Sequence, residues 1–206
     1  MTKVRLKLPF LLLLVMALVV LPFLTMKFVS NDLKEEEADY TIDEVIESDV
    51  PVVNTTTIIN PYLDQSVTIK KGYYDYKAEE KNQVDSIIKH DDTYIQNKGI
   101  DYVGDNVFDV IAILNGTVSS VKEDEELGKT VEIKHDNGMI SIYQSLSEVN
   151  VKKGDIISQG YVIGKSGENK LDKDLGNHLH FEIYNNGSSV NPLNYLNTEV
   201  SLEKEN

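Results

Sequence analysis

The chain has 206 residues, and its 20 Lys and Arg against 34 Asp and Glu give a formal charge of −14. A chain this acidic repels phosphate backbones, which argues against nucleic acid as a partner. It contains no cysteine, so disulfides, thiolate metal ligands and a cysteine nucleophile are excluded, and any metal site must use His, Asp or Glu.

The first 30 residues are typical of a membrane anchor. The run from Leu8 to Met26 has no charged residue, and a helix of that length reaches roughly 28 Å, close to the thickness of a bilayer core. Three basic residues precede the run and only Lys27 follows before an acidic stretch. A cleaved signal peptide is the alternative, but residues 24–31 lack a small-x-small cleavage pattern. We expect one transmembrane helix within residues 1–30, with a cytoplasmic N-terminus.

Residues 31–60 are predicted to form an acidic stalk. Between Asn31 and Val50 there are nine acidic residues and a single basic residue, Lys34. Like charges this dense oppose the formation of an isolated helix. β-branched runs begin after Pro51, which predicts that strands start there. We place a compact domain at residues 61–198 and an acidic tail at residues 199–206.

The compact domain is predicted to be mainly β. One helical segment is expected between Ala78 and Lys89, where Val84, Ile87 and Ile88 recur at helical spacing. The segment 151–167 contains four glycines and indicates tight turns between short strands of the scaffold.

A β-hairpin is predicted around Asn137-Gly138. This pair is typical of a type I′ turn, whose two central residues both have positive φ. A two-residue loop of this kind pairs His135 with Ile140 and Ile133 with Ile142.

The segment His178-Leu179-His180-Phe181-Glu182 carries the strongest chemical signal. On a strand, His178, His180, Glu182 and Tyr184 share one face, and the two imidazoles lie about 6 to 7 Å apart. That spacing suits either one metal ligand beside one general acid or base, or two ligands of one ion. A solvated polar face is the alternative for these residues taken alone.

Three segments together resemble the motifs of the lysostaphin-like (LytM-type) zinc endopeptidases. That family carries His-x-x-x-Asp, Tyr-x-His-Leu and His-x-His motifs in this order. Here residues 97–101 read Asn-Lys-Gly-Ile-Asp, residues 143–147 read Tyr-Gln-Ser-Leu-Ser, and residues 178–180 read His-Leu-His. The resemblance implies an antiparallel β-sheet domain of this fold, with two of the family's histidines replaced.

Carried over by position, the resemblance implies a zinc site at Asn97, Asp101 and His180, with Ser145 and His178 in the places of the proton-transfer histidines. An Asn amide is a poor zinc ligand, and losing one of three protein ligands removes roughly 3 to 5 kcal/mol of zinc binding. A serine hydroxyl does not titrate near neutral pH. We therefore expect no bound metal, no other cofactor and no catalytic residue, with these five positions as vestiges of an active site.

The two remaining histidines have simpler interpretations. His135 ends a predicted strand and is expected to be packed or capping. His90, beside two aspartates, is expected to be solvated and paired.

A longer stretch, residues 67–196, is similar to a sporulation branch of this family in endospore-forming bacteria. The anchor, the stalk, the Tyr-Tyr-Asp at residues 73–75 and the Tyr-Gln-Ser-Leu-Ser form carry this similarity. It implies a non-catalytic protein of the forespore membrane whose domain lies in the intermembrane space. There it would bind the extracytoplasmic domain of stage III sporulation protein AH, as part of a channel or bridge to the mother cell during engulfment.

Two alternatives stay open. One is a weakly active zinc metalloendopeptidase that cleaves peptidoglycan, with zinc as its cofactor. The other is a pseudo-enzyme that regulates another wall hydrolase. The face that carries His178 and His180 is also a candidate surface for binding cell-wall peptide.

Overall fold

The computed structural model describes residues 55–202, so the predicted membrane helix and most of the predicted stalk lie outside these residues. Within 55–202, no helix combines the length and the apolar character needed to cross a bilayer. The strands and helices of this part follow one another in the order β1 (Thr55–Thr57), β2 (Thr68–Lys71), α2 (Glu80–Asp85), β3 (Ile87–His90), β4 (Thr93–Gln96), β5 (Ile100–Val103), β6 (Asp109–Ile111), β7 (Gly116–Asp124), β8 (Gly128–His135), β9 (Ile140–Val149), β10 (Ile156–Ile157), β11 (Val162–Ser166), η1 (Lys173–Leu175), β12 (Leu179–Asn185), β13 (Ser188–Val190), η2 (Pro192–Asn194) and β14 (Glu199–Ser201).

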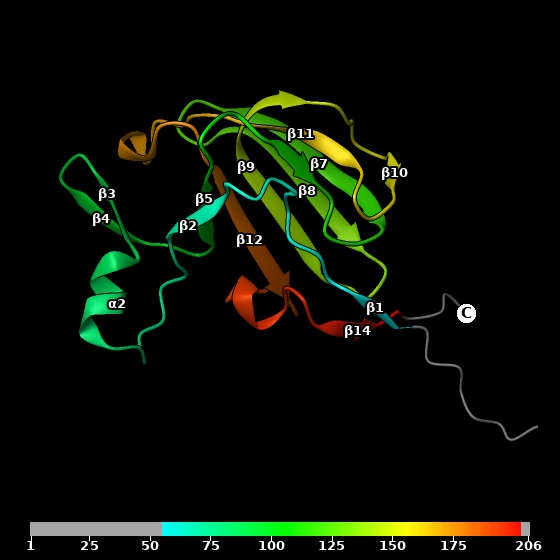
Figure 1. Ribbon diagram of the computed structural model, residues 1–206, viewed down its shortest axis with the longest axis horizontal. Coiled ribbons are helices and arrows are strands. Elements are labelled where there is room, and N and C mark those ends of the chain that lie inside the picture. The colour runs from blue at the N-terminus through cyan, green and yellow to red at the C-terminus, as the bar shows by residue number, and fades with distance from the viewer. Residues whose placement is uncertain (1–54, 203–206) are drawn as a thin grey trace, which may run out of the picture. The chain divides into compact units, whose positions relative to one another are not determined.

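A large antiparallel sheet dominates the described part, as the sequence predicts (Figure 1). Its strands follow the order β10-β7-β8-β9-β12-β5-β2, while β11 pairs with β6 and β9, and β13 pairs with β12. The order places β12 between β9 and β5. The three segments that resemble the zinc-peptidase motifs therefore come together on adjacent strands.

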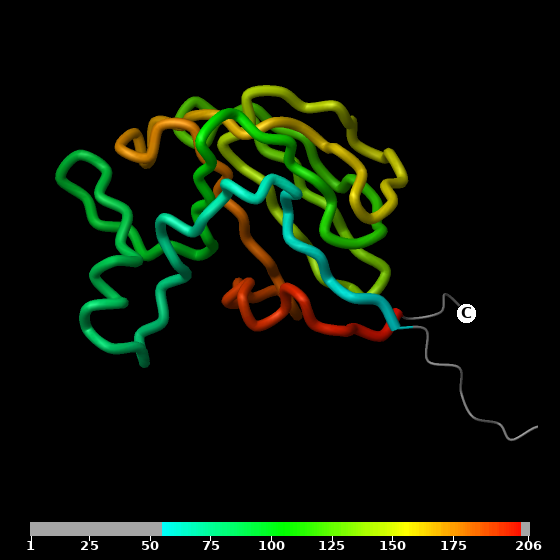
Figure 2. The backbone as a smooth tube through the Cα atoms, viewed as in Figure 1, coloured from blue at the N-terminus to red at the C-terminus, as the bar shows by residue number. Residues whose placement is uncertain are grey.

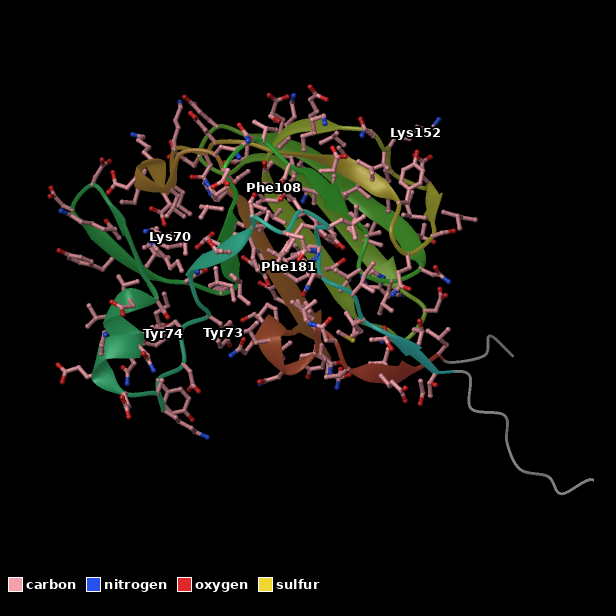
Figure 3. The ribbon with its side chains drawn as sticks, viewed as in Figure 1. Lys70, Tyr73, Tyr74, Phe108, Lys152 and Phe181 are labelled. Carbon is pink, nitrogen blue, oxygen red and sulfur yellow. The ribbon has the colours of Figure 1, made fainter. Side chains whose placement is uncertain are left out.

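The core lies on one face of this sheet. Leu179, Phe181 and Ile183 alternate along β12 and are fully buried, as strand periodicity predicts. Phe181 packs against Tyr143 of β9, with ring centroids 5.2 Å apart, and against Tyr102 of β5 at 6.5 Å. Figure 3 shows the Phe181 side chain among the strands of the sheet. These rings fix the three site-bearing strands relative to one another.

A small excursion interrupts the chain between β2 and β5. It contains α2 and the β3–β4 hairpin, which Figure 1 shows standing beside the main sheet. Tyr74 faces this excursion, where its hydroxyl donates to Gln83 at 3.2 Å, whereas Tyr73 donates to the Ser189 carbonyl at 3.3 Å (Figure 3). The two neighbouring tyrosines thus join the excursion to β13.

The helix predicted between Ala78 and Lys89 is much shorter than expected. Only residues 80–85 are helical, Val84 is 64% exposed, and Ile87 and Ile88 belong to β3. Three apolar residues at helical spacing are equally compatible with one helical turn followed by a strand. Here the pairing of Ile87 and Ile88 with β4 favours the strand.

The register predicted for the β8–β9 hairpin is wrong by one residue. Lys134, not His135, pairs with Ile140, and Ile133 pairs with Ser141. Only Gly138 of the turn has positive φ, at 80°, so the loop is a three-residue turn closed by Gly138 and not a type I′ turn.

The two ends of the described chain meet. β1 pairs with β14, so that Thr55 lies opposite Ser201 (Figure 2). Ile58, next to β1, is fully buried in the core. Ordered structure therefore begins before residue 61 and continues past residue 198.

Candidate functional site

The candidate site forms where β5, β12 and β9 run side by side. His180 of β12 lies opposite Asp101 of β5 on one side and opposite Gln144 of β9 on the other. Ser145 follows Gln144 directly. The vestigial positions predicted from sequence are therefore brought together by strand pairing, and all five are buried, with exposures of 7% or less.

Asn97 occupies the first metal position with its amide already fully bonded. Its Nδ2 donates to Asp101 Oδ2 at 2.8 Å and to the Gly72 carbonyl at 3.0 Å. Its Oδ1 accepts from the Gly99 backbone N–H at 3.1 Å. The only atom of Asn97 that could approach a cation is thus committed to the backbone.

Position 99 has no room for a side chain, which explains the glycine there. A Cβ at this position would lie 2.3 Å from the Phe181 carbonyl oxygen, well inside contact distance. Its φ does not lie in the left-handed region. Glycine is therefore required here by the close approach of β12 and not by a left-handed bend.

His180 lies between two carboxylates. Its Nδ1 is 2.7 Å from Asp101 Oδ1 and its Nε2 is 2.9 Å from Glu182 Oε1. Burial disfavours the charged ring, but Asp101 and then Glu182 outweigh it and raise the pKa of His180 to about 10. Burial likewise opposes ionisation of Glu182, yet its hydrogen bond to His180 holds the pKa of this carboxyl below its usual value. The ring therefore donates from both nitrogens.

These donors do not fit a zinc ion. A metal at His180 would have to displace the proton that the ring shares with Asp101 or Glu182, and the Asn97 oxygen is used by the Gly99 N–H. Each Asp101 oxygen already accepts a hydrogen bond, one from Asn97 and one from His180.

Ser145 and His178 form a second bonded pair. His178 Nδ1 lies 2.7 Å from the Gly176 carbonyl, so Nδ1 carries the proton and Nε2 accepts. Ser145 Oγ lies 2.9 Å from this Nε2 and accepts from Asn169 Nδ2 at 2.7 Å. Burial lowers the pKa of His178, which favours the neutral ring.

A serine that donates to a histidine is also the arrangement of a nucleophile and its base, but access to this pair is closed. Ser145 and His178 are both fully buried. The loop that carries Asn169 is fastened by several contacts, including Asp172 to Lys71 of β2 and the Lys170 N–H to the Glu126 carbonyl. No substrate carbonyl can reach the Ser145 hydroxyl in this arrangement.

Two contacts of the site were not predicted from the sequence. Glu182 was placed on the histidine face, but its contact with His180 was not foreseen, although the spacing of two residues on one strand carries that information. Asn169 lies in a loop and reaches Ser145 across 24 positions of sequence. No local pattern predicts such a contact.

The other histidines have the simple roles expected of them. His135 is 3% exposed, with Nδ1 2.9 Å from the Asn115 carbonyl and Nε2 2.7 Å from Ser141 Oγ, and burial lowers its pKa. His90 is partly exposed and lies 3.5 Å from a Glu126 carboxylate oxygen.

Comparisons with known proteins show which family this fold and site resemble. The model of peptidase family M23 matches residues 95–192, the segment that contains all five vestigial positions. A zinc-containing peptidase from Vibrio cholerae shares the fold, with a TM-score of 0.53 and 20% identity over 68% of this chain and 39% of that one. Fold and site together define a degenerate peptidase of the LytM type.

Residues 95–192 match peptidase family M23, and the chain is similar to stage II sporulation protein Q. It is 38% identical to that protein from Bacillus subtilis (strain 168) over 185 residues, which cover 85% of this chain and 65% of the relative. Two solved structures of the SpoIIQ–SpoIIIAH complex contain chains 40% identical to this one. One matches with a TM-score of 0.67 over 68% of this chain and 91% of that one, and the other with 0.65 over 69% and 100%.

Proposed function

We propose that this chain is a non-catalytic sporulation protein whose extracytoplasmic domain binds a partner protein. The observation that carries the proposal is the closed hydrogen-bond network at the vestigial metal position. Asn97, Asp101, His180 and Glu182 satisfy one another, with distances of 2.7 to 2.9 Å between their side chains. A site of this kind serves folding and needs no metal.

The network removes both requirements of zinc-dependent hydrolysis. Activating a water molecule needs a metal with an open coordination position and a group that accepts or delivers a proton. The donors at positions 97 and 180 are committed to other bonds, and Ser145 cannot carry a proton near neutral pH. His178 alone keeps the chemistry of a base, but it is buried.

The partner proposed is the extracytoplasmic domain of stage III sporulation protein AH. Support comes from the 40% identity to chains in two structures of the SpoIIQ–SpoIIIAH complex. The chain spans 65% of the length of its Bacillus subtilis relative. We place the binding surface in the part that the two proteins share.

The same proposal includes the membrane arrangement expected from sequence. Residues 1–30 anchor the chain in the forespore membrane, the acidic stretch that follows forms the stalk, and the domain from β1 to β14 projects into the intermembrane space. The acidic stretch after residue 30 and the uncharged run before it support this order.

The test is a binding measurement with the full-length chain in detergent micelles. We expect saturable 1:1 binding to the stage III sporulation protein AH domain. The zinc content should be below about 0.1 ion per chain, an order of magnitude less than in a complete site. Purified peptidoglycan should release no peptides. Stoichiometric zinc together with wall cleavage would establish the alternative, a weak metalloendopeptidase. Recovery of a wall hydrolase instead of the channel partner would favour the regulatory pseudo-enzyme.

A further inference from the structure

The sequence contains three Asn-Gly pairs, at residues 115–116, 137–138 and 186–187. In such a pair the glycine backbone nitrogen can attack Cγ of the asparagine side chain, because glycine has no Cβ to hinder the approach. A new N–Cγ bond forms, the Cγ–Nδ2 bond breaks, and ammonia leaves with the proton of the glycine N–H. Water then opens the resulting succinimide ring at either carbonyl carbon, which gives aspartate or isoaspartate. The fold determines which of the three pairs can react.

The pair at 115–116 is held within the main sheet. Asn115 Oδ1 accepts from the Gln159 backbone N–H at 2.8 Å. Gly116 is buried at the start of β7, where it pairs with His135 of β8 and Ile157 of β10. A Cβ at Gly116 would lie 2.5 Å from a backbone oxygen of β8, so the neighbouring strand lies against this backbone and opposes its rotation. Ring closure here requires local unfolding of β7.

The pair at 137–138 has both of its reacting groups engaged in hydrogen bonds. Asn137 Oδ1 accepts from the Met139 N–H at 3.1 Å, and its Nδ2 donates to Met139 Sδ at 3.2 Å. The Gly138 N–H, which carries the attacking nitrogen, donates to the His135 carbonyl at 3.0 Å. This pair therefore also reacts only when the turn opens.

The pair at 186–187 forms the tip of the β12–β13 hairpin and is free of such contacts. Asn185 pairs with Ser188, which leaves a loop of two residues. Asn186 and Gly187 have φ of 51° and 76°, so the type I′ turn expected at 137–138 occurs here. Both residues are exposed. Within residues 55–202, neither the Asn186 side chain nor the Gly187 N–H makes a hydrogen bond.

We infer that Asn186 is a site of spontaneous deamidation in the folded chain and that Asn115 and Asn137 are protected. The reaction consumes water alone and does not depend on the proposed function. Ring closure requires a brief opening of the turn. β13 (Ser188–Val190) pairs with β12 and with no other described strand, so this opening disrupts three residue pairs and leaves the rest of the sheet intact.

The two products affect the hairpin differently. Aspartate keeps the length of the main chain and suits a type I′ turn. Isoaspartate adds one methylene to the main chain, so the loop no longer matches the pairing of β12 with β13. The Ser189 carbonyl of β13 accepts from the Tyr73 hydroxyl at 3.3 Å, and Val190 packs against the core. Isoaspartate at position 186 therefore loosens β13 and its junction with the excursion.

Ageing of the full-length chain in detergent micelles tests the inference. The folded chain is incubated in warm, mildly alkaline buffer, and its peptides are followed by mass spectrometry together with enzymatic methylation of isoaspartate. We expect Asn186 to convert at least about tenfold faster than Asn115 or Asn137, because the latter two react only through local opening. In urea, where the fold protects none of the three pairs, the three rates should converge.

Variants and hydrogen exchange provide the second measurement. Asn186→Gln should remove most of the isoaspartate signal of the folded chain, because glutamine would have to close a six-membered ring. The matched control is Asn137→Gln, which makes the same change in another Asn-Gly turn and should keep that signal. In aged chains, the amides of residues 188–190 should exchange at least about tenfold faster in molecules that carry isoaspartate, and those of aged Asn186→Gln should not change.

Two results would overturn the inference. Conversion of Asn115 or Asn137 as fast as Asn186 in the folded chain would refute the protection argued from their hydrogen bonds. A folded chain that stays unmodified at Asn186 while the urea sample converts would refute the site itself. If Asn186→Gln does not fold, the comparison of the three pairs within the unmodified chain still decides between these results.

Discussion

Replacing Asn97 by alanine tests whether the vestigial metal position now serves folding. The substitution removes two neutral hydrogen bonds, to Gly72 and Gly99, and one bond to the Asp101 carboxylate. Buried neutral bonds contribute about 1 kcal/mol each and bonds to charged groups about 1.5 to 3 kcal/mol. Asn97 is only 1% exposed, so water does not replace these bonds. We expect the free energy of unfolding to fall by about 3 to 5 kcal/mol.

The assay is urea unfolding followed by far-UV circular dichroism, with and without a zinc chelator. Asn150→Ala is the control, because Asn150 is exposed and its side chain makes no hydrogen bond to the described residues, and it should change stability by less than about 0.5 kcal/mol. The chelator should leave the unmodified chain unchanged. A loss of less than about 1 kcal/mol for Asn97→Ala would refute the view that this position stabilises the fold.

Three further predictions concern the same scaffold. Asn97→His should raise zinc affinity, measured by competition with a chelating dye, without wall hydrolysis while Ser145 remains; hydrolysis by this single variant would contradict the assigned loss of the proton carrier. Because the pKa of His135 is lowered in the folded state, the unfolded chain binds more protons below about pH 6.5, so stability should fall as pH drops from there, by at most about 1.4 kcal/mol per pH unit. His135→Gln should show a shallower slope in unfolding curves between pH 7 and pH 5, and an unchanged slope would rule this out. Gly99→Ala should destabilise the chain by several kcal/mol, because its Cβ would lie 2.3 Å from a backbone oxygen, whereas Gly154→Ala, with open space around it, should cost about 1 to 2 kcal/mol for its positive φ; equal losses in thermal unfolding would argue against the clash.

Much of the site could be predicted because strand alternation and motif order depend on local sequence. The sequence predicts that His180, Glu182 and Tyr184 share one face of a strand, and in β12 they alternate with Leu179, Phe181 and Ile183, which are fully buried. What could not be predicted depends on contacts between distant segments. The Asn169 bond to Ser145 is of this kind. The hairpin register failed for a different reason, since Asn137-Gly138 is compatible with loops of two or three residues and the packing of both strands chooses between them.

The structure shows how the histidine and the aspartate of the motif contribute to folding. A charged His180 buried beside Asp101 and Glu182 is stable only while both partners are present, because removing one partner of a buried ion pair typically costs about 3 to 5 kcal/mol. The set therefore resists piecemeal replacement even when no chemistry depends on it.

Asn97 and Ser145 also contribute hydrogen bonds to this buried site. Each supplies the hydrogen bond that its neighbour needs, Asn97 to Asp101 and Ser145 to His178. A hydrophobic residue at position 97 would leave a buried oxygen of Asp101 without a partner, and one at position 145 would leave His178 Nε2 with only its 3.2 Å contact to Asn169. Asn97 and Ser145 thus keep β5, β9 and β12 joined.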